Sequence, residues 1–162
     1  MSNNATLSRS AARVQAALAA AGVVARVVEL PASTRTAAEA ASAIGCQVAQ
    51  IAKSLIFRGA TSGNPILVIA SGTNRVNESL VALAAGEALG KADAEFVRVR
   101  VGFAIGGIPP VGHDEPLRTF IDEDLFQYDR IWAAAGTPHA VFELSPTDLP
   151  RLTGGRVLRI AM

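Results

Sequence analysis

Residues 102–113 read Gly-Phe-Ala-Ile-Gly-Gly-Ile-Pro-Pro-Val-Gly-His. The glycines of this stretch can adopt positive φ or let another group approach the main chain closely. Pro109 and Pro110 fix φ and remove two N–H donors, so the remaining amides point in set directions. Such a loop suits a carbonyl group or a developing oxyanion. A tight connection between two strands would use the same residue types, and that interpretation stays open.

Lys53 is the second unusual feature of the chain. Only two of the fifteen Lys and Arg residues are lysines, and Lys53 stands near the start of an apolar run that extends to Phe57. Burial lowers the pKa of a lysine, which can then act as a compact donor or, once neutral, as a base, whereas an arginine stays charged. These properties suggest a functional amine. The alternative is a lysine that extends from an edge strand into solvent.

Length and charge restrict the class of protein. The 162 residues are enough for one domain with a substantial core, and half of them are hydrophobic. No apolar run approaches the roughly 20 residues of a membrane span, and the N-terminus lacks the apolar segment of a signal peptide. We therefore expect a cytoplasmic protein without a membrane partner. The net charge of +1 argues against binding of nucleic acid by bulk electrostatics, so a nucleic-acid partner would be recognised through an end or another small feature.

Motifs for cofactors and metals do not occur in the sequence. The glycine spacing over 102–107 differs from a dinucleotide fingerprint, neither lysine belongs to a P-loop, and there is no G-x-S-x-G elbow. The lone Cys46 excludes a disulfide within the chain and is typical of a small core residue. The two histidines lack metal-ligand spacing. We predict no cofactor and no metal, and a site built from Lys53, the glycine loop and polar residues on turns.

Capping residues and hydrophobic periodicity predict the secondary structure. The expected helices cover 8–21, 36–44, 77–85 and 145–154, each starting at a polar cap, with a helical turn over 122–126. The expected strands cover 25–30, 53–58, 66–70, 103–105, 117–121, 131–135, 140–144 and 157–160, and a turn or short helix covers 87–89.

Residues 94–101 fit two patterns. The alternation of Val97, Val99 and Val101 favours a strand, whereas Asp93 before Ala94 fits the start of a helix, and the alternation is the stronger signal. The elements show no regular βα alternation, which indicates an α+β fold with a mixed sheet. We expect a flexible N-terminus over residues 1–7 and a single domain over residues 8–162.

Three groups of residues match a known pattern in order and spacing. They are Ile51-Ala52-Lys53-Ser54-Leu55, Gly102-Phe103-x-x-Gly106-Gly107-Ile108-x-Pro110-x-Gly112, and Ile121-Asp122. In these residues the chain resembles the YbaK / prolyl-tRNA-synthetase-associated editing domain family, and the resemblance covers nearly the whole chain from about residue 8. It implies a single α+β domain with a mixed, partly barrel-like sheet flanked by helices. It also implies a short helix near residues 94–99.

The resemblance implies trans-editing, the hydrolysis of the ester that joins a wrong amino acid to the terminal adenosine of a tRNA. Editing is needed because a synthetase pocket for one small side chain cannot strongly reject another that fits inside it. The implied substrates are alanyl- and cysteinyl-tRNA(Pro), held at the acceptor end, and prolyl-tRNA synthetase is a further implied partner. The attacking group would be water or, with a cysteine substrate, the thiol of the substrate itself.

The resemblance assigns catalysis to Lys53 and substrate positioning to the glycine loop. The residues expected to contact substrate are Thr36, Ser54, Gly106, Gly107, Ile108, Pro109, Pro110, Gly112, His113, Asp122 and His139. Capping alone would also explain Thr36 and Asp122. Ser54 stands where relatives carry Thr or Asn, so the amino-acid preference stays open. The alternative functions are a non-catalytic module that binds tRNA ends or a synthetase, and a hydrolase of small esters or amides.

Overall fold

The computed structural model of the protein describes residues 7–162. Its centre is one eight-stranded sheet with the order β1-β7-β6-β2-β3-β5-β8, in which β4 also pairs with β2. The strands are β1 (Val27–Glu29), β2 (Ile51–Gly59), β3 (Pro65–Ser71), β4 (Leu89–Lys91), β5 (Arg118–Asp122), β6 (Ile131–Ala134), β7 (Ala140–Leu144) and β8 (Arg156–Leu158). The expected flexible segment lies outside the described residues except for Leu7, which packs against the main core.

The sheet combines parallel and antiparallel pairs. β2 runs antiparallel to β3 and parallel to β6, while β5 runs parallel to both β3 and β8. The predicted α+β class with a mixed sheet flanked by helices is therefore confirmed. Within residues 7–162, β1 and β8 end the strand order without pairing with each other, so the sheet stays open and does not close into a barrel.

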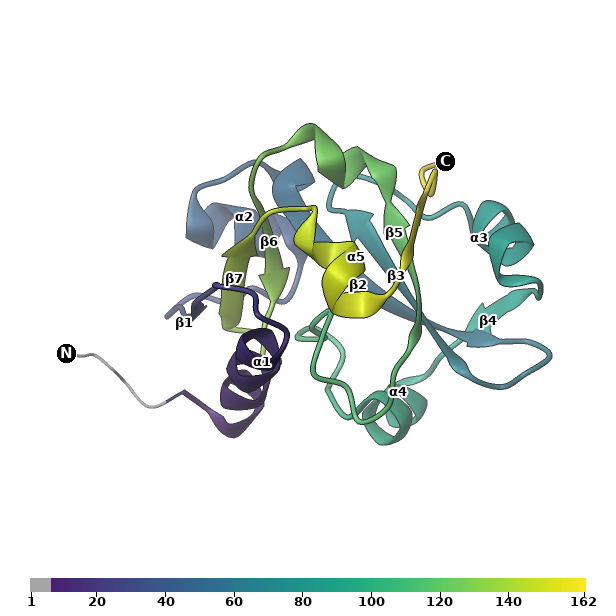
Figure 1. The fold of residues 1–162 in the computed structure, drawn as a ribbon, viewed down its shortest axis with the longest axis horizontal. Coiled ribbons are helices and arrows are strands. Elements are labelled where there is room, and N and C mark those ends of the chain that lie inside the picture. Colours follow the sequence, from purple (N-terminus) through teal and green to yellow (C-terminus); the bar gives the residue numbers. More distant parts are fainter. Residues whose placement is uncertain (1–6) are drawn as a thin grey trace.

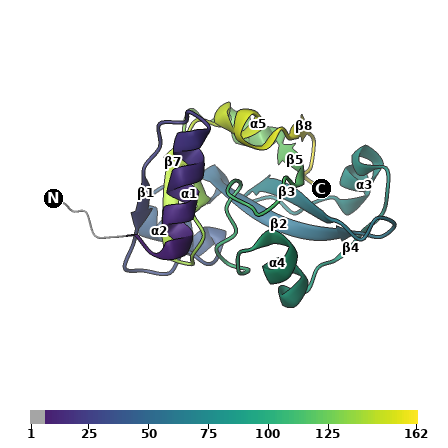
Figure 2. The ribbon, with the colours of Figure 1, turned by 60° about the horizontal axis from the view of Figure 1, so that its bottom comes forward.

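Helices cover both the ends and the faces of this sheet. Within residues 7–162 they are α1 (Arg9–Ala20), α2 (Ala37–Ile44), α3 (Glu78–Ala85), α4 (Ala94–Val101) and α5 (Asp148–Thr153), with two 3₁₀ turns, η1 (Val48–Gln50) and η2 (Glu123–Gln127). Figures 1 and 2 show α1 beside β1 and β7 at one end of the molecule and α3 at the other end. None of these helices combines the length and the apolar character needed to cross a membrane.

Several helices start at the predicted caps. Ser8 and Asn77 accept hydrogen bonds from first-turn amides of α1 and α3. Thr36 and Glu39 form the predicted capping box, in which each side chain accepts a hydrogen bond from the other residue's amide. A cap of this kind contributes about 1 kcal/mol. The capping box also fixes the loop before α2, which carries part of the site.

The prediction of a strand over residues 94–101 is wrong, because this segment is helix α4. Asp93 caps the helix by accepting a hydrogen bond from Phe96 N at 2.8 Å. Val97 and Val101, one helical turn apart, are buried in the main core, whereas Val99 is 60% exposed. The same valine spacing fits a strand and one face of a short helix, and tertiary packing decides between them. The helix implied by the family resemblance is confirmed.

Three smaller predictions are also wrong. Residues 103–105 form no strand, because Gly102 ends α4 in the left-handed region and the chain turns directly into the loop. The expected turn or short helix near residue 89 is instead the start of β4, which pairs with Arg58 and its neighbours. Ser145 does not cap the last helix, since α5 begins at Asp148 after a turn.

One edge of β2 pairs with β3, and the other edge pairs with two different strands. There β6 pairs with Ile51 and Ala52, and β4 pairs with residues 57–59. No described strand pairs with residues 53–56 on that side. In an antiparallel strand, alternate residues direct both N–H and C=O away from the partner. Residues 53–56 of β2 therefore present backbone donors and acceptors at an open edge.

Candidate active site

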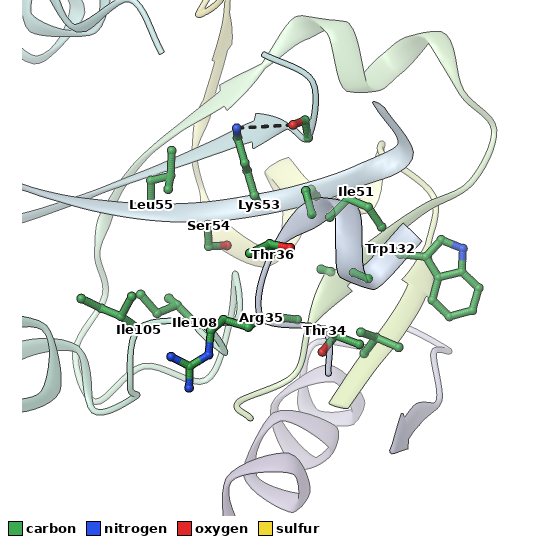
Figure 3. Close-up of a pocket in the computed structure, with 18 of the residues that line it drawn as sticks. Thr34, Arg35, Thr36, Ile51, Lys53, Ser54, Leu55, Ile105, Ile108 and Trp132 are labelled. Atoms are coloured by element: carbon green, nitrogen blue, oxygen red, sulfur yellow. Dashed lines mark hydrogen bonds between the residues drawn. The ribbon is translucent and has the colours of Figure 1, made fainter. Parts of the chain in front are cut away.

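The open edge of β2 forms one wall of a cavity of about 640 Å³, which we call the β2 cavity. Further walls come from residues 34–38 at the start of α2, from residues 105–108 of the glycine loop, and from β6. Figure 3 shows Lys53 and Ser54 on β2, with Arg35 across from Ser54. Most of the wall is apolar. Sites of roughly 300–1,000 Å³ enclose drug-sized molecules, so the β2 cavity suits a ligand larger than a small amino acid.

Two cationic side chains, Lys53 and Arg35, lie on the wall of the β2 cavity, and among the described residues no Asp or Glu does. Four ion pairs form within residues 7–162, and neither cation takes part in them. Solvent screens the half-buried Lys53 less than the exposed Arg35, and with no carboxylate on the described wall the cavity is electropositive. It therefore favours a ligand that is anionic or that develops negative charge.

Lys53 donates a hydrogen bond from Nζ to the Gly72 carbonyl oxygen at 3.5 Å. Burial lowers the pKa of the Lys53 ammonium, and the charge of Asp122 opposes this shift. Asp122 is fully buried, where its Oδ2 accepts from Ser71 N at 3.0 Å and from Asn74 Nδ2 at 2.8 Å. This carboxylate supports the protonated form of Lys53 without lying on the cavity wall. Its observed contacts are those of a fixed structural anion.

Two hydroxyl groups on the wall of the β2 cavity have no hydrogen-bond partner among the described residues. They are Thr34 Oγ1 and Ser54 Oγ, and both atoms are buried. A buried hydroxyl without a partner costs about 1–3 kcal/mol, so such groups are rare unless water or a ligand completes them. Ser54 was predicted from the sequence as a substrate contact. Its side chain lines the cavity, but the hydroxyl oxygen has no exposed surface, so a contact to a ligand requires the side chain to rotate.

The glycine loop contributes Gly106 and Ile108 to the cavity wall. Their N–H groups have no backbone partner within residues 7–162. Gly107 N donates to Ala104 O at 3.2 Å, and Gly107 O accepts from Gly136 N at 2.8 Å. A Cβ at Gly107 would lie 2.6–2.8 Å from the backbone of Thr137, so only glycine fits. Gly107 therefore anchors the loop, while Gly106 and Ile108 line the cavity with amides that have no backbone partner among the described residues.

The turn over residues 136–139 holds two cavity walls together. It binds the glycine loop through Gly136, and it binds the 34–36 loop through Pro138 O, which accepts from Thr34 N at 2.6 Å. The exposed His139 donates from Nδ1 to Ala32 O at 3.1 Å. His139 was predicted to contact substrate. It lies off the cavity wall and fixes the chain that leads to Thr34.

Pro109, Pro110, Gly112 and His113 belong to the second half of the glycine loop and lie off the cavity wall. His113 Nε2 lies 2.7 Å from Pro109 O, so the Nε2–H tautomer donates to this carbonyl. Burial lowers the pKa of His113, which favours the neutral ring. The ring also packs edge-on against Phe103, with 6.1 Å between ring centroids. These contacts of His113 hold the second half of the glycine loop in place.

Of the residues predicted from the sequence, the structure brings five onto the wall of one cavity. They are Thr36, Lys53, Ser54, Gly106 and Ile108. Sequence reasoning missed Thr34, Arg35 and Trp132, which share that wall. Arg35 looks like any surface arginine in the sequence. The only local signal is that Arg35 directly precedes Thr36, which starts the capping box. This signal does not reveal which part of the protein the Arg35 side chain contacts.

The chain is similar to several known proteins. Residues 31–152 match the model of the aminoacyl-tRNA editing domain. A crystal structure described as "a putative trans-editing enzyme for prolyl tRNA synthetase" is 49% identical, with a TM-score of 0.91 over 97% of this chain and 99% of that chain.

Two curated relatives are each 28% identical to this chain. One, from Enterococcus faecalis (strain ATCC 700802 / V583), is named "Putative Cys-tRNA(Pro)/Cys-tRNA(Cys) deacylase EbsC", and the match covers 77% of this chain and 76% of that protein. The other is the uncharacterized protein YwhH of Bacillus subtilis (strain 168), matched over 81% of this chain and 83% of its own length. Because the family model spans most of the chain, the protein belongs to the aminoacyl-tRNA editing domain family, and its reaction class is the deacylation of aminoacyl-tRNA.

Proposed function

We propose that this protein acts in trans to hydrolyse the ester of mischarged tRNA(Pro), with alanyl- or cysteinyl-tRNA(Pro) as substrate. The observation that carries the proposal is the β2 cavity, where Lys53 lines a wall that holds no carboxylate among the described residues. The similar crystal structure and the relative EbsC, whose names refer to prolyl tRNA synthetase and to Cys-tRNA(Pro), support the choice of tRNA.

The proposed reaction adds water to the carbonyl carbon of the ester. The tetrahedral intermediate then expels the ribose oxygen, which takes up a proton, and the products are the free amino acid and a tRNA with a free terminal hydroxyl. Negative charge develops on the carbonyl oxygen. Lys53 and the unpartnered amides of Gly106 and Ile108 are the groups available to stabilise it.

The cavity wall offers no activated nucleophile among the described residues. Cys46 lies off the wall, and burial raises the pKa of its thiol, so the thiolate is disfavoured. Ser54 Oγ has no hydrogen-bonded base to activate it. The attacking group therefore comes from solvent or, for a cysteine substrate, from the thiol of the substrate. In the second case the thiol loses its proton, forms a cyclic thioester and expels the ribose oxygen, which takes up a proton, and water then opens the thioester to the free amino acid.

In this proposal the aminoacyl group and the terminal adenosine of the substrate bind in different regions of the β2 cavity. The aminoacyl group lies against Ser54 and Thr34, whose hydroxyls lack partners, and the terminal adenosine extends along the apolar remainder. A near-neutral chain, with net charge +1, binds the acceptor end without a strong field for the rest of the tRNA. Association with prolyl-tRNA synthetase would raise the local concentration of substrate.

A deacylation panel tests the proposal. The purified full-length chain is incubated with tRNA(Pro) charged with alanine, cysteine or proline, and the remaining aminoacyl-tRNA is measured over time against a protein-free control. We expect hydrolysis of the alanyl or cysteinyl ester and sparing of prolyl-tRNA(Pro). Binding of these tRNAs without turnover of any of them would instead support a non-catalytic module. Equal turnover of free aminoacyl esters would support a hydrolase of small esters.

A further inference from the structure

We propose that Arg35 binds the 5′-phosphate of the terminal nucleotide of the tRNA, in a phosphate subsite of the β2 cavity. This inference rests on the proposed function for the identity of the ligand. It adds a binding site and a residue that the sequence resemblance did not assign. Three observations carry it: the unpaired charge of Arg35, the position of its stem against the glycine loop, and the chemistry of the substrate.

The guanidinium of Arg35 has no anionic partner within residues 7–162. Glu39 is the nearest carboxylate along the chain, and its Oε1 is engaged by Ser33 Oγ and Thr36 N. Arg35 is exposed, and its side chain lies on the wall of the β2 cavity, which Lys53 also lines. Figure 3 shows its guanidinium near Ile105 and Ile108.

The side chain of Arg35 rests on the glycine loop. Gly106 has φ +100°, and a Cβ at this glycine would lie 3.0 Å from Arg35 Cγ and 3.5 Å from Arg35 Nε. The stem of the arginine therefore occupies the space that a side chain at residue 106 would need. The backbone is held on both sides of Arg35, by the Thr34 bond to Pro138 O and by the capping box at Thr36. Less backbone entropy is therefore lost at this residue on binding.

The chemistry of the substrate explains why a second cation is needed. In an aminoacyl-tRNA the terminal ribose carries both the ester and the 5′-phosphate, so a cavity that holds the ester at Lys53 holds the phosphate one sugar away. The phosphate is the only formal anion on that nucleotide. Guanidinium binds phosphate with two parallel hydrogen bonds, which fixes orientation as well as position. Arg35 would thus align the ribose so that the ester meets Lys53.

A binding experiment tests the phosphate subsite without catalysis. Adenosine 5′-monophosphate and adenosine are titrated into the full-length chain, and binding is followed by calorimetry and by fluorescence of Trp132, the single tryptophan, which lines the cavity. We expect the nucleotide to bind at least tenfold more tightly than the nucleoside. In the Arg35→Ala variant this difference should vanish while the affinity for adenosine stays within twofold. Arg35→Lys should retain part of the preference.

Controls separate a loss of binding from a loss of folding. Arg26 is exposed, forms none of the four ion pairs and lies off the cavity, so Arg26→Ala should bind like the wild type. Arg35→Gln keeps the polar character and the first part of the stem and removes the charge, and it should behave like Arg35→Ala. An unchanged thermal midpoint in each variant shows that the fold is intact. A wild-type protein without preference for the nucleotide, or an Arg35→Ala variant that retains it, would overturn the proposal.

Kinetics separate this proposal from the proposed function. Aminoacyl esters of adenosine and of adenosine 5′-monophosphate differ only in the phosphate. We expect Arg35→Ala to lower kcat/KM about 10- to 100-fold for the phosphorylated ester, and to leave the other ester within twofold. Equal losses on both esters would contradict a phosphate contact. If the wild type hydrolyses neither ester nor tRNA yet binds the nucleotide through Arg35, the proposed function fails and the phosphate subsite stands.

Discussion

Lys53 Nζ lies 3.5 Å from the carbonyl oxygen of Gly72, and this long hydrogen bond is the only one that the Lys53 side chain makes within residues 7–162. An ammonium has three donors, so two remain for a ligand. Gly72 is fixed at this place, because a Cβ there would collide with Val48 O. The Lys53 ammonium is thus weakly hydrogen-bonded to a carbonyl of fixed position at the wall of an electropositive cavity. This arrangement suits a group that stabilises negative charge as it develops on a substrate.

The pH dependence of deacylation follows from the pKa of Lys53. Burial lowers this pKa below the ordinary lysine value of 10.5, so the ammonium is lost at a lower pH than for a free lysine. If the ammonium stabilises the oxyanion, kcat/KM corrected for spontaneous hydrolysis should fall as pH rises through that lowered pKa. Initial rates between pH 6 and about 10 measure this. A rate that rises through the same range would indicate a neutral lysine acting as base.

The stability of the protein should increase when Lys53 becomes apolar. Because the pKa of Lys53 is lowered in the folded state, the unfolded state binds more protons between the two pKa values, and stability contributed by this residue rises with pH. Lys53→Met removes the half-buried charge and keeps an unbranched stem of similar length. We expect a higher thermal midpoint near neutral pH and loss of activity. A lower midpoint would show that Lys53 is structural.

Substitution of Ser54 tests whether its hydroxyl group contacts the substrate. Ser54→Ala deletes a buried hydroxyl that lacks a partner, which should leave stability unchanged or raise it by about 1 kcal/mol. Deacylation should decrease, since the substrate loses a polar contact. Thr34→Val makes the same change on the facing loop. Urea unfolding and deacylation rates on the same samples give both quantities, and a stability loss without an effect on rate would refute the assignment.

Gly107 should tolerate no side chain. Its Cβ would lie 2.6–2.8 Å from the backbone of Thr137, which is itself fixed in the turn that holds two cavity walls. We expect Gly107→Ala to lower the free energy of unfolding by about 1–3 kcal/mol and to reduce deacylation. Gly154 provides the control, because a Cβ there meets no atom within 4 Å. Gly154→Ala should lose stability only through its positive φ and should remain active.

His113 should make the fold sensitive to acid. Burial lowers its pKa in the folded state, so the unfolded state takes up the proton first, and stability falls as pH decreases through the ordinary histidine range near 6.5. His113→Gln keeps a donor for Pro109 O and cannot titrate. The thermal midpoints of the two proteins, measured from pH 8 to pH 5, should therefore diverge toward low pH. Parallel curves would assign the acid sensitivity to other groups.

Local signals account for most of the correct predictions from the sequence. The capping box at Thr36 and the cap at Ser8 require only residues within one turn, so the starts of α1 and α2 could be read directly. The strand pattern of β2 and β3 was similarly clear. The valines of α4 carry both periodicities, and the choice depended on Val97 and Val101 packing in the core. β4 exists because it pairs with the distant end of β2.

The site could be predicted in part. Lys53 and Gly106 are distant in the sequence, yet the shared pattern of the family placed them together, and both line the β2 cavity. Arg35 and Thr34 were missed because their direction depends on the turn over residues 136–139, which no local pattern connects to them. His113 and His139 have the chemistry of a site, but their hydrogen bonds to backbone carbonyls are visible only in three dimensions.

A comparison of the two lysines tests the central claim most directly. Lys53→Ala and Lys91→Ala remove the same group, but Lys91 is exposed on β4 and lies off the cavity wall. In single-turnover deacylation of mischarged tRNA(Pro), we predict a loss of at least 100-fold for Lys53→Ala and a rate within twofold of the wild type for Lys91→Ala. Equal rates for Lys53→Ala and the wild type would contradict the role of Lys53 in the reaction.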